Sequence, residues 1–189
     1  MGVANKNSIA WAIARQLAAQ GAELAFTHQG DKLLRRVKPL AESVQPKGSN
    51  SEPILCDCDV TNDQQMEATF HRLKEEWGTI DFLVHAIAFA GKDQLDGSFI
   101  ENTTRDGFKS ALDISAYSFV DAGRRASEIM NDGGAMVTLT YLGSERVIPN
   151  YNVMGVAKAA LEASTRYICL LYTSPSPRDA TLSRMPSSA

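Results

Sequence analysis

The chain has 189 residues, of which 44% are hydrophobic and 22% charged, the balance of an ordinary globular protein with one full core. Its formal net charge of −3 and the absence of a Lys/Arg run give no general attraction to nucleic acid. The odd number of cysteines, three, implies no disulfide framework, and neither a signal peptide nor an apolar run of about 18 residues is present. These features predict a reduced, cytoplasmic protein without a membrane anchor.

Helical and extended patterns alternate along the first half of the chain. Residues 8–21 predict a helix, because Ile9, Ile13 and Leu17 recur at four-residue spacing before a glycine. The segments that follow are a strand at 23–27, a helix that opens at Asp31, a loop at 46–53, a strand at 54–60, a helix at 61–78 and an apolar strand at 82–89. Cys56 and Cys58 alternate along one of these strands, which favours a shared strand face over a metal site.

The second half continues the alternation. It predicts a polar loop at 91–97, a long helical region at about 104–130, a turn at 132–134, a strand at 135–141 and a helix at 151–167. Strands that alternate with helices imply βαβ units, so we expect an α/β protein with a Rossmann-like, doubly wound parallel sheet. Ligands of such folds bind beyond the carboxyl ends of the strands. The polar and glycine-bearing segments expected at that edge are 2–9, 27–31, 59–60, 86–90 and 140–158.

Tyr151 and Lys158 stand seven residues apart near the start of the last predicted helix, where Asn150 is a plausible N-cap. Seven steps of about 100° return to the same helix face, which Met154 shares or borders. A phenol and an ammonium on one face form a proton-donating pair, and the lysine charge is expected to lower the tyrosine pKa. The spacing also occurs by chance in many helices. Tyr141, at the end of the preceding strand, is either a second site tyrosine or a packing aromatic.

The ordered motifs together resemble the bacterial NADH-dependent enoyl-[acyl-carrier-protein] reductases, within the short-chain dehydrogenase/reductase superfamily. Most superfamily members carry Tyr-x-x-x-Lys, whereas Tyr151 and Lys158 have the longer spacing of the enoyl reductases. The segment 2–10, GVANKNSIA, is similar to the divergent cofactor loop of that family. The other matching segments are Gln29, Asp59-Val60, 93–97 and 144–151. The resemblance extends from Gly2 to about Tyr167.

This resemblance implies hydride transfer from NADH to C3 of a trans-2-enoyl thioester carried by acyl carrier protein, in fatty acid biosynthesis. Tyr151 would donate a hydrogen bond to the enolate oxygen, and Lys158 would hold the nicotinamide ribose. Tyr141 would be the second active-site tyrosine. The substrate would lie near Ala90, Tyr141 and Met154.

The resemblance also implies which residues hold the cofactor, NADH/NAD. Gly2 would allow close approach of the backbone, and the helix start at Ser8 and Ile9 would offer N–H groups to the pyrophosphate. Gln29 would lie at the adenosine ribose, where a neutral amide favours NADH over NADPH. Asp59 and Val60 would lie at the adenine, and Ile87 would lie beneath the nicotinamide. His85 is expected to be a core or rim histidine.

We expect a partial reductase domain over residues 1–169 and a non-matching, disordered Ser/Pro-rich tail over residues 170–189. The resemblance implies a further strand before Gly2 and further segments after the last helix, so the sequence is interpreted as truncated at both ends. The resemblance also implies a homotetramer. Two alternatives stay open. One is another short-chain dehydrogenase/reductase, a ketoreductase or alcohol dehydrogenase, and the other is a non-catalytic nucleotide-binding protein.

Overall fold

The computed structural model describes residues 1–45 and 52–171, which belong to two compact units. Unit 1 comprises residues 1–88 and 121–139, and unit 2 comprises residues 89–120 and the chain from 140 onward. The loop expected at 46–53 lies outside the described residues except for its last two positions. The tail expected at 170–189 lies outside them except for the end of a helix at Leu171.

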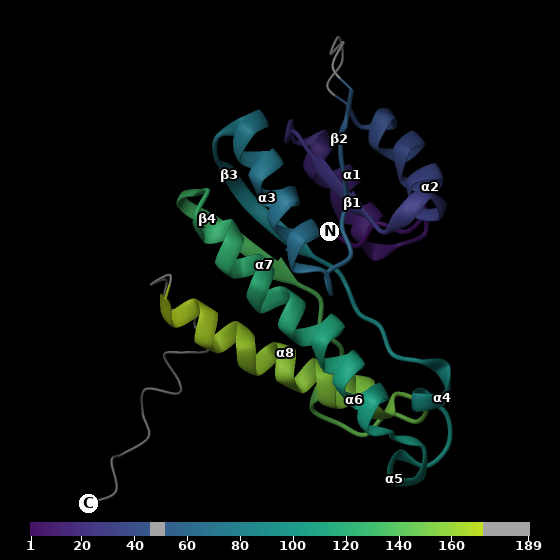
Figure 1. The fold of residues 1–189 in the computed structure, drawn as a ribbon. Helices are drawn as coiled ribbons and strands as arrows, with labels where there is room; N and C mark the ends of the chain where they lie inside the picture. Colours follow the sequence, from purple (N-terminus) through teal and green to yellow (C-terminus); the bar gives the residue numbers. More distant parts are fainter. Residues whose placement is uncertain (46–51, 172–189) are drawn as a thin grey trace, which may run out of the picture. The chain divides into compact units, whose positions relative to one another are not determined.

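Unit 1 is built from alternating helices and parallel strands (Figure 1). Its elements are α1 (Ile9–Ala19), β1 (Ala25–His28), α2 (Gly30–Ser43), β2 (Ile54–Asp57), α3 (Asp63–Trp77), β3 (Ile80–His85), most of α7 (Ser118–Ser127) and β4 (Met130–Thr138). β1 pairs with β2 and β3 pairs with β4, both in parallel. Parallel pairs joined by helices confirm the α/β, Rossmann-like fold class predicted from the sequence.

Two buried clusters hold these helices against the strands. The first joins α3, α7, β2 and β3 through Ile54, Cys56, Cys58, Met66, Phe70, Leu73, Ile80, Leu83, Ala122, Ala126 and Ile129. The second joins α1, α2 and β1 through Val3, Ala10, Trp11, Ala14, Phe26, Val37 and Ala41. Cys56 and Cys58 both lie in the first cluster, as expected for alternate residues on one strand face. Burial of this apolar surface is the main force that fixes the strands between the helices.

Several boundaries in unit 1 differ from those read from the sequence. Helix α1 begins as expected, but it buries Ala10, Trp11 and Ala14 and leaves Ile9 68% exposed. Strand β3 ends at His85, earlier than its apolar run, because its last partner in β4 is Thr138. The turn expected at 132–134 lies inside β4, as an irregularity of the pairing between Ile80 and Phe82. Pairing between strands that are distant in the sequence therefore determines where β3 and β4 begin and end.

The described residues of unit 2 form helices and short helical turns. They are α4 (Lys92–Leu95), α5 (Phe99–Asn102), α6 (Arg105–Leu112), the π-helical turn η1 (Asp113–Tyr117), the first residues of α7, the short 3₁₀ turn η2 (Leu142–Ser144) and α8 (Asn152–Leu171). The loop expected at 91–97 thus contains a short helix, and the helical region expected at 104–130 becomes the run α6, η1 and α7. Helix α8 packs against α6, η1 and η2. It buries a stripe at helical spacing, formed by Val153, Met154, Ala157, Lys158 and Leu161.

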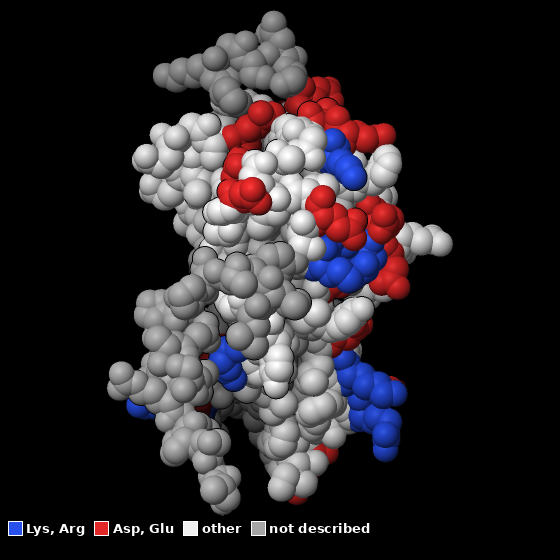
Figure 2. Space-filling view, turned by 90° about the vertical axis from the view of Figure 1, so that its left-hand side faces the viewer, with Lys and Arg blue, Asp and Glu red and all other residues white. Residues whose placement is uncertain are grey.

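The surface carries charges of both signs. Figure 2 shows acidic and basic side chains interspersed on the face it presents, as expected for 19 Lys and Arg against 22 Asp and Glu. Among the described residues, no helix combines the length and apolar character needed to cross a membrane.

Candidate functional site

The first candidate position, Gly2, lies against the end of β3 in unit 1. Its φ of +100° belongs to the region that side chains disfavour, and a Cβ there would lie 2.2 Å from the Ala86 carbonyl oxygen. The neighbouring Met1 bonds to the same strand end, because its carbonyl accepts from Ala86 N (3.1 Å) and its amine donates to the Val84 carbonyl (2.8 Å). Only glycine fits at this position. The close approach seen in unit 1 is to Ala86, and approach to a cofactor stays a prediction.

The start of α1 has no side-chain cap. Ser8 is its N-cap residue, but the Ser8 hydroxyl donates to the Asn5 carbonyl (2.7 Å) instead of accepting from the first turn. Ile9, the first helical residue, is largely exposed. The N–H groups of the first turn and the positive end of the helix dipole are therefore not satisfied by a capping side chain. This helix end has the chemistry that suits a pyrophosphate.

Gln29 and Asp59 are joined directly at the carboxyl ends of β1 and β2. The parallel register places His28 beside Asp57. Just beyond this pair, the amide of Gln29, the residue after His28, donates to the carboxylate of Asp59 at 2.7 Å. Asp59 also accepts from the backbone N–H of Thr61 (2.9 Å) and from its hydroxyl (2.7 Å). The Thr61 backbone bond is the main reason that the pKa of Asp59 is lowered. A fixed anionic carboxylate therefore stands at this strand edge.

Val60 and Ile87, the remaining cofactor positions predicted in unit 1, are half-buried. Val60 packs against the first buried cluster, and Ile87 follows the end of β3. His85 is fully buried, and its Nδ1 lies 3.2 Å from the Thr138 hydroxyl, so the expectation of a core histidine is confirmed. Packing against the core thus explains in part why these two positions are hydrophobic.

In unit 2 the two candidate tyrosines meet. The ring centroids of Tyr141 and Tyr151 are 4.9 Å apart at an interplanar angle of 61°, an edge-to-face contact. Tyr151 is half-buried, whereas Tyr141 is 50% exposed. Gly143 makes room for this pair, because a Cβ there would lie 2.3 Å from the Tyr151 ring. Both phenols are therefore presented by one short segment, which turns through η2.

Tyr151 stands just ahead of the helix that carries Lys158. Helix α8 begins at Asn152, and Tyr151 is in the preceding turn, where its carbonyl accepts from Met154 N (2.9 Å). Asn150 has a φ of 59°, so it forms a left-handed turn and not an extended N-cap. Lys158 and Met154 both belong to the buried stripe of α8. The helix starts one residue later than predicted, after the left-handed turn at Asn150.

Burial dominates the electrostatics of this group. It raises the pKa of Tyr151, with a smaller contribution in the same direction from the charge of Tyr141. Burial also lowers the pKa of Lys158, which is 6% exposed. The sequence expectation that lysine would lower the pKa of Tyr151 is therefore wrong. The Tyr151 phenol stays protonated at neutral pH, as a hydrogen-bond donor must.

Two anchoring residues escaped the sequence analysis. The carboxylate of Glu162 accepts from the hydroxyls of Thr140 (2.5 Å) and Ser144 (2.6 Å), which flank Tyr141 on both sides. The hydroxyl of Ser115 bonds to the backbone N–H of Phe89 (3.0 Å) and donates to its carbonyl (3.1 Å), next to the half-buried Ala90. A signal for Glu162 existed, because Lys158 and Glu162 are spaced by four in an otherwise apolar segment of α8. Ser115 had no such signal.

Comparison with known proteins gives consistent matches. A family model described as "Enoyl-(Acyl carrier protein) reductase" matches residues 2–176. "Enoyl-[acyl-carrier-protein] reductase [NADH] 2" of Rhizobium meliloti is 54% identical over 186 residues, which are 98% of this chain and 67% of the relative. "Enoyl-[acyl-carrier-protein] reductase [NADH] FabI" of Bacillus cereus is 51% identical over 89% of this chain and 64% of its own length. The chain thus spans about 60 to 67% of the length of the first curated relatives.

Solved structures agree with these matches. The Bacillus cereus enoyl-acyl carrier protein reductase, crystallised with NADP+ and indole naphthyridinone, has a TM-score of 0.85 and 50% identity over 90% of this chain and 64% of that one. The Anaplasma phagocytophilum enoyl-(acyl-carrier-protein) reductase, crystallised with NAD, has a TM-score of 0.84 and 44% identity over 90% of this chain and 63% of that one.

Parallel strand pairs packed by helices, with a tyrosine ahead of a lysine-bearing helix, define a Rossmann-like protein of the short-chain dehydrogenase/reductase type. Within that class, the match over residues 2–176 decides the family. The chain belongs to the enoyl-(acyl carrier protein) reductase family.

Proposed function

We propose that the protein reduces trans-2-enoyl thioesters of acyl carrier protein to acyl thioesters, in fatty acid biosynthesis, with NADH as the hydride donor. The names of relatives at 51 to 54% identity support this reaction. The observation that carries the proposal is the Tyr141–Tyr151 pair held just ahead of the helix that bears Lys158. This arrangement supplies hydrogen-bond donors and a cation, which reduction of a conjugated thioester requires.

The residues of unit 1 fit a dinucleotide. The uncapped start of α1 at Ser8 and Ile9 would receive the pyrophosphate, and Gly2 leaves the neighbouring backbone without a side chain. Gln29 and Asp59 would receive the adenosine, with Val60 at the adenine and Ile87 at the nicotinamide side. The cofactor, when bound, supplies a hydride. The anionic Asp59 beside Gln29 disfavours the 2′-phosphate that distinguishes NADPH, and this favours NADH.

Tyr151 would stabilise the enolate oxygen that develops on the thioester. A raised pKa keeps its proton in place, so the phenol can donate to an oxyanion at neutral pH. Partial burial strengthens such a hydrogen bond because little water competes for it. Tyr141 fixes the ring of Tyr151 by edge-to-face contact and offers a second hydroxyl.

Lys158 would hold the nicotinamide ribose with its ammonium group. Burial on α8 restricts its side chain, so its position is set by the helix and not by solvent. Its lowered pKa means that the buried charge costs stability, which is a common feature of functional groups. Met154 on the same buried stripe and Ala90 beside the Ser115 anchor would contact the substrate.

The partner that this function implies is acyl carrier protein with its enoyl thioester. We further propose a cytoplasmic homotetramer, with neither a membrane nor nucleic acid among its partners. The formal net charge of −3 supports the last point, because an excess of positive charge favours binding to nucleic acid.

Binding and turnover can be tested separately. NADH fluorescence titration of this chain tests the unit 1 assignment, with Asp59→Ala expected to weaken binding several-fold and Asp63→Ala, on exposed α3 surface, expected to leave it unchanged. Turnover of crotonyl thioester is measured in a chimera in which residues 1–176 replace the matching segment of the Rhizobium meliloti relative. NADH consumption by this chimera supports the function. A folded chimera that binds NADH and leaves the thioester unreduced would contradict it.

A further inference from the structure

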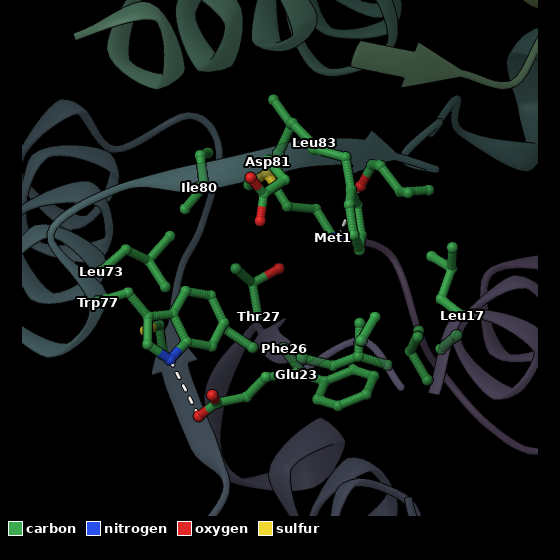
Figure 3. Close-up of a pocket in the computed structure, with 18 of the residues that line it drawn as sticks. Met1, Leu17, Glu23, Phe26, Thr27, Leu73, Trp77, Ile80, Asp81 and Leu83 are labelled. Carbon is green, nitrogen blue, oxygen red and sulfur yellow. Dashed lines mark hydrogen bonds between the residues drawn. The ribbon is translucent and has the colours of Figure 1, made fainter. Parts of the chain in front are cut away.

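A carboxylate at the end of β2 contacts the start of the neighbouring helix α2. Asp57 is the one acidic residue of β1 and β2, and it lies beside His28 at the carboxyl ends of both strands. Its Oδ1 accepts a hydrogen bond from the backbone N–H of Gly30 at 2.8 Å. Further back along β1, Phe26 and Thr27 line a largely apolar cavity of about 250 Å³ (Figure 3). The charge of this strand pair is therefore confined to the edge where α2 begins.

This contact takes the place of a cap on α2. Gln29 is the N-cap residue, but its side chain makes no cap bond and donates to Asp59 instead. The first N–H of the helix, at Gly30, finds its acceptor across the sheet, on Asp57. His28 Nδ1 lies 3.6 Å from the same oxygen, beyond hydrogen-bond distance, so the backbone bond is the one that fixes the carboxylate. A helix start of this kind would otherwise suit a phosphate.

The acids at this edge come from an unusual strand. In dinucleotide-binding folds of this type, the acid that bonds to the ribose 2′-hydroxyl follows the strand ahead of this helix. In this chain that strand ends in His28 and Gln29, which are not acids. The adjoining strand supplies the carboxylates instead, with Asp57 bonded to Gly30 N and Asp59 bonded to the Gln29 amide. Both carboxylates are thus fixed by groups at the start of α2.

The start of α2 has room for a phosphate but an unfavourable charge. A Cβ at Gly30 would meet nothing within 4 Å, so the space beside it is open. The side chain of Asp57 is 56% exposed, so a phosphate in that space would meet its charge. Asp31 and Lys32, the next residues of α2, are exposed and of opposite charge, so they offset one another. The strand-end carboxylates therefore make the local charge negative, and like charges repel.

We propose that Asp57 is a specificity-determining residue, which excludes the 2′-phosphate of NADPH from the start of α2 and so selects NADH. The inference rests on the proposed function, because it takes the adenosine to lie at Gln29 and Asp59. A phosphate monoester carries close to two negative charges at neutral pH and above, and it would compete with Asp57 for the Gly30 N–H. Selection thus comes from an occupied donor and a repulsive charge, without a steric block.

The test compares NADH with NADPH in fluorescence titrations of the full chain at about pH 8, where the 2′-phosphate is ionised. Asp57→Asn keeps an acceptor for the Gly30 N–H and removes the charge, so the ratio of the NADPH to the NADH dissociation constant should fall about tenfold. Asp57→Ala also frees the N–H, and the ratio should fall further. The matched control is Glu42→Gln, at an exposed acid near the other end of α2, which should leave the ratio unchanged.

A second measurement needs no variant. Salt screens repulsion from an exposed carboxylate, so the ratio for the unchanged chain should fall as NaCl rises from about 20 mM to about 500 mM. A ratio that Asp57→Asn leaves unchanged, or one that does not fall with salt, would overturn the inference, while NADH binding would still support the proposed function. Absence of NADH binding by the unchanged chain would contradict the cofactor assignment and the inference with it.

Discussion

Unit 1 and unit 2 hold their candidate residues by different means. In unit 1 the backbone dominates, since Gly2 lies against the Ala86 carbonyl and Gln29 reaches Asp59 from adjoining strand ends. In unit 2 side-chain packing dominates, since Tyr151 contacts Tyr141 beside Gly143. The difference teaches that the candidate cofactor residues of unit 1 depend on sheet geometry, whereas the two tyrosines of unit 2 depend on side-chain volume and on hydroxyl anchors.

Both units bury some side chains completely, such as Val37 and Met66 in unit 1 and Ala157 and Leu161 in unit 2, so the contrast lies in how the candidate residues are held and not in overall packing. The predictions that follow test this contrast, from the largest expected effect to the smallest.

The largest effect is expected at Tyr151. In the chimera with the Rhizobium meliloti relative, Tyr151→Phe removes the donor to the enolate oxygen, and kcat should fall about 100-fold or more. Tyr167→Phe, at a phenol 75% exposed on α8, is the control and should change kcat little. Steady-state NADH consumption measures both. Equal rates for the two variants would remove Tyr151 from the chemistry.

Gly2→Ala tests whether the close backbone contact between Gly2 and Ala86 is needed for the stability of unit 1. The new Cβ meets the Ala86 carbonyl oxygen and also a positive φ, whereas Gly21→Ala meets a positive φ of 90° with open space around it. Gly2→Ala should therefore lower the free energy of unfolding by about 2 kcal/mol or more beyond the loss in Gly21→Ala. Urea unfolding followed by circular dichroism measures the difference. A difference near zero would show that this approach tolerates a side chain.

The Met1 amine makes the stability of unit 1 depend on pH. Burial lowers the pKa of this amine from 8.0 to about 6 in the folded chain, so the unfolded chain binds more protons between those values. In a polypeptide with a free amine at Met1, the free energy of unfolding should rise by about 2 to 3 kcal/mol as pH increases from 6 to 8.

Acetylation of the amine is the control for this pH effect. It should abolish that part of the slope and leave the remaining pH dependence, which both forms share. Identical slopes with and without the acetyl group would show that the amine is not buried.

The smallest effect is expected at Glu162, which holds the segment of Tyr141 through the hydroxyls of Thr140 and Ser144. Glu162→Gln replaces an anionic acceptor by a neutral one, so kcat in the chimera should fall about three- to tenfold with little change in KM. Glu145→Gln, at an exposed position of unit 2, is the matched control. If Tyr141 is released, its fluorescence anisotropy should fall as well. A change in KM alone would favour a structural role for Glu162.

The sequence by itself determined the fold class and the family. The alternation of helical and extended patterns predicts parallel pairing, and the pairs β1–β2 and β3–β4 confirm it. Local signals also predicted α3 correctly, because Asn62 accepts from the N–H groups of Gln64 and Gln65 and Gly78 ends the helix. Such signals act within a few residues, so they can be read without the rest of the chain.

Tertiary structure decided the positions that depend on distant partners. Strand β3 ends at His85 because Thr138 is the last residue of β4 that pairs with it. The apolar run in the sequence continues beyond His85 and does not show where the strand ends. The pKa of Tyr151 is raised and not lowered because its side chain is partly buried in the packed chain. Glu162 acquires its role only when α8 brings it to two hydroxyls. Pairing, burial and long-range hydrogen bonds are properties of the packed chain, and local sequence patterns do not encode them individually.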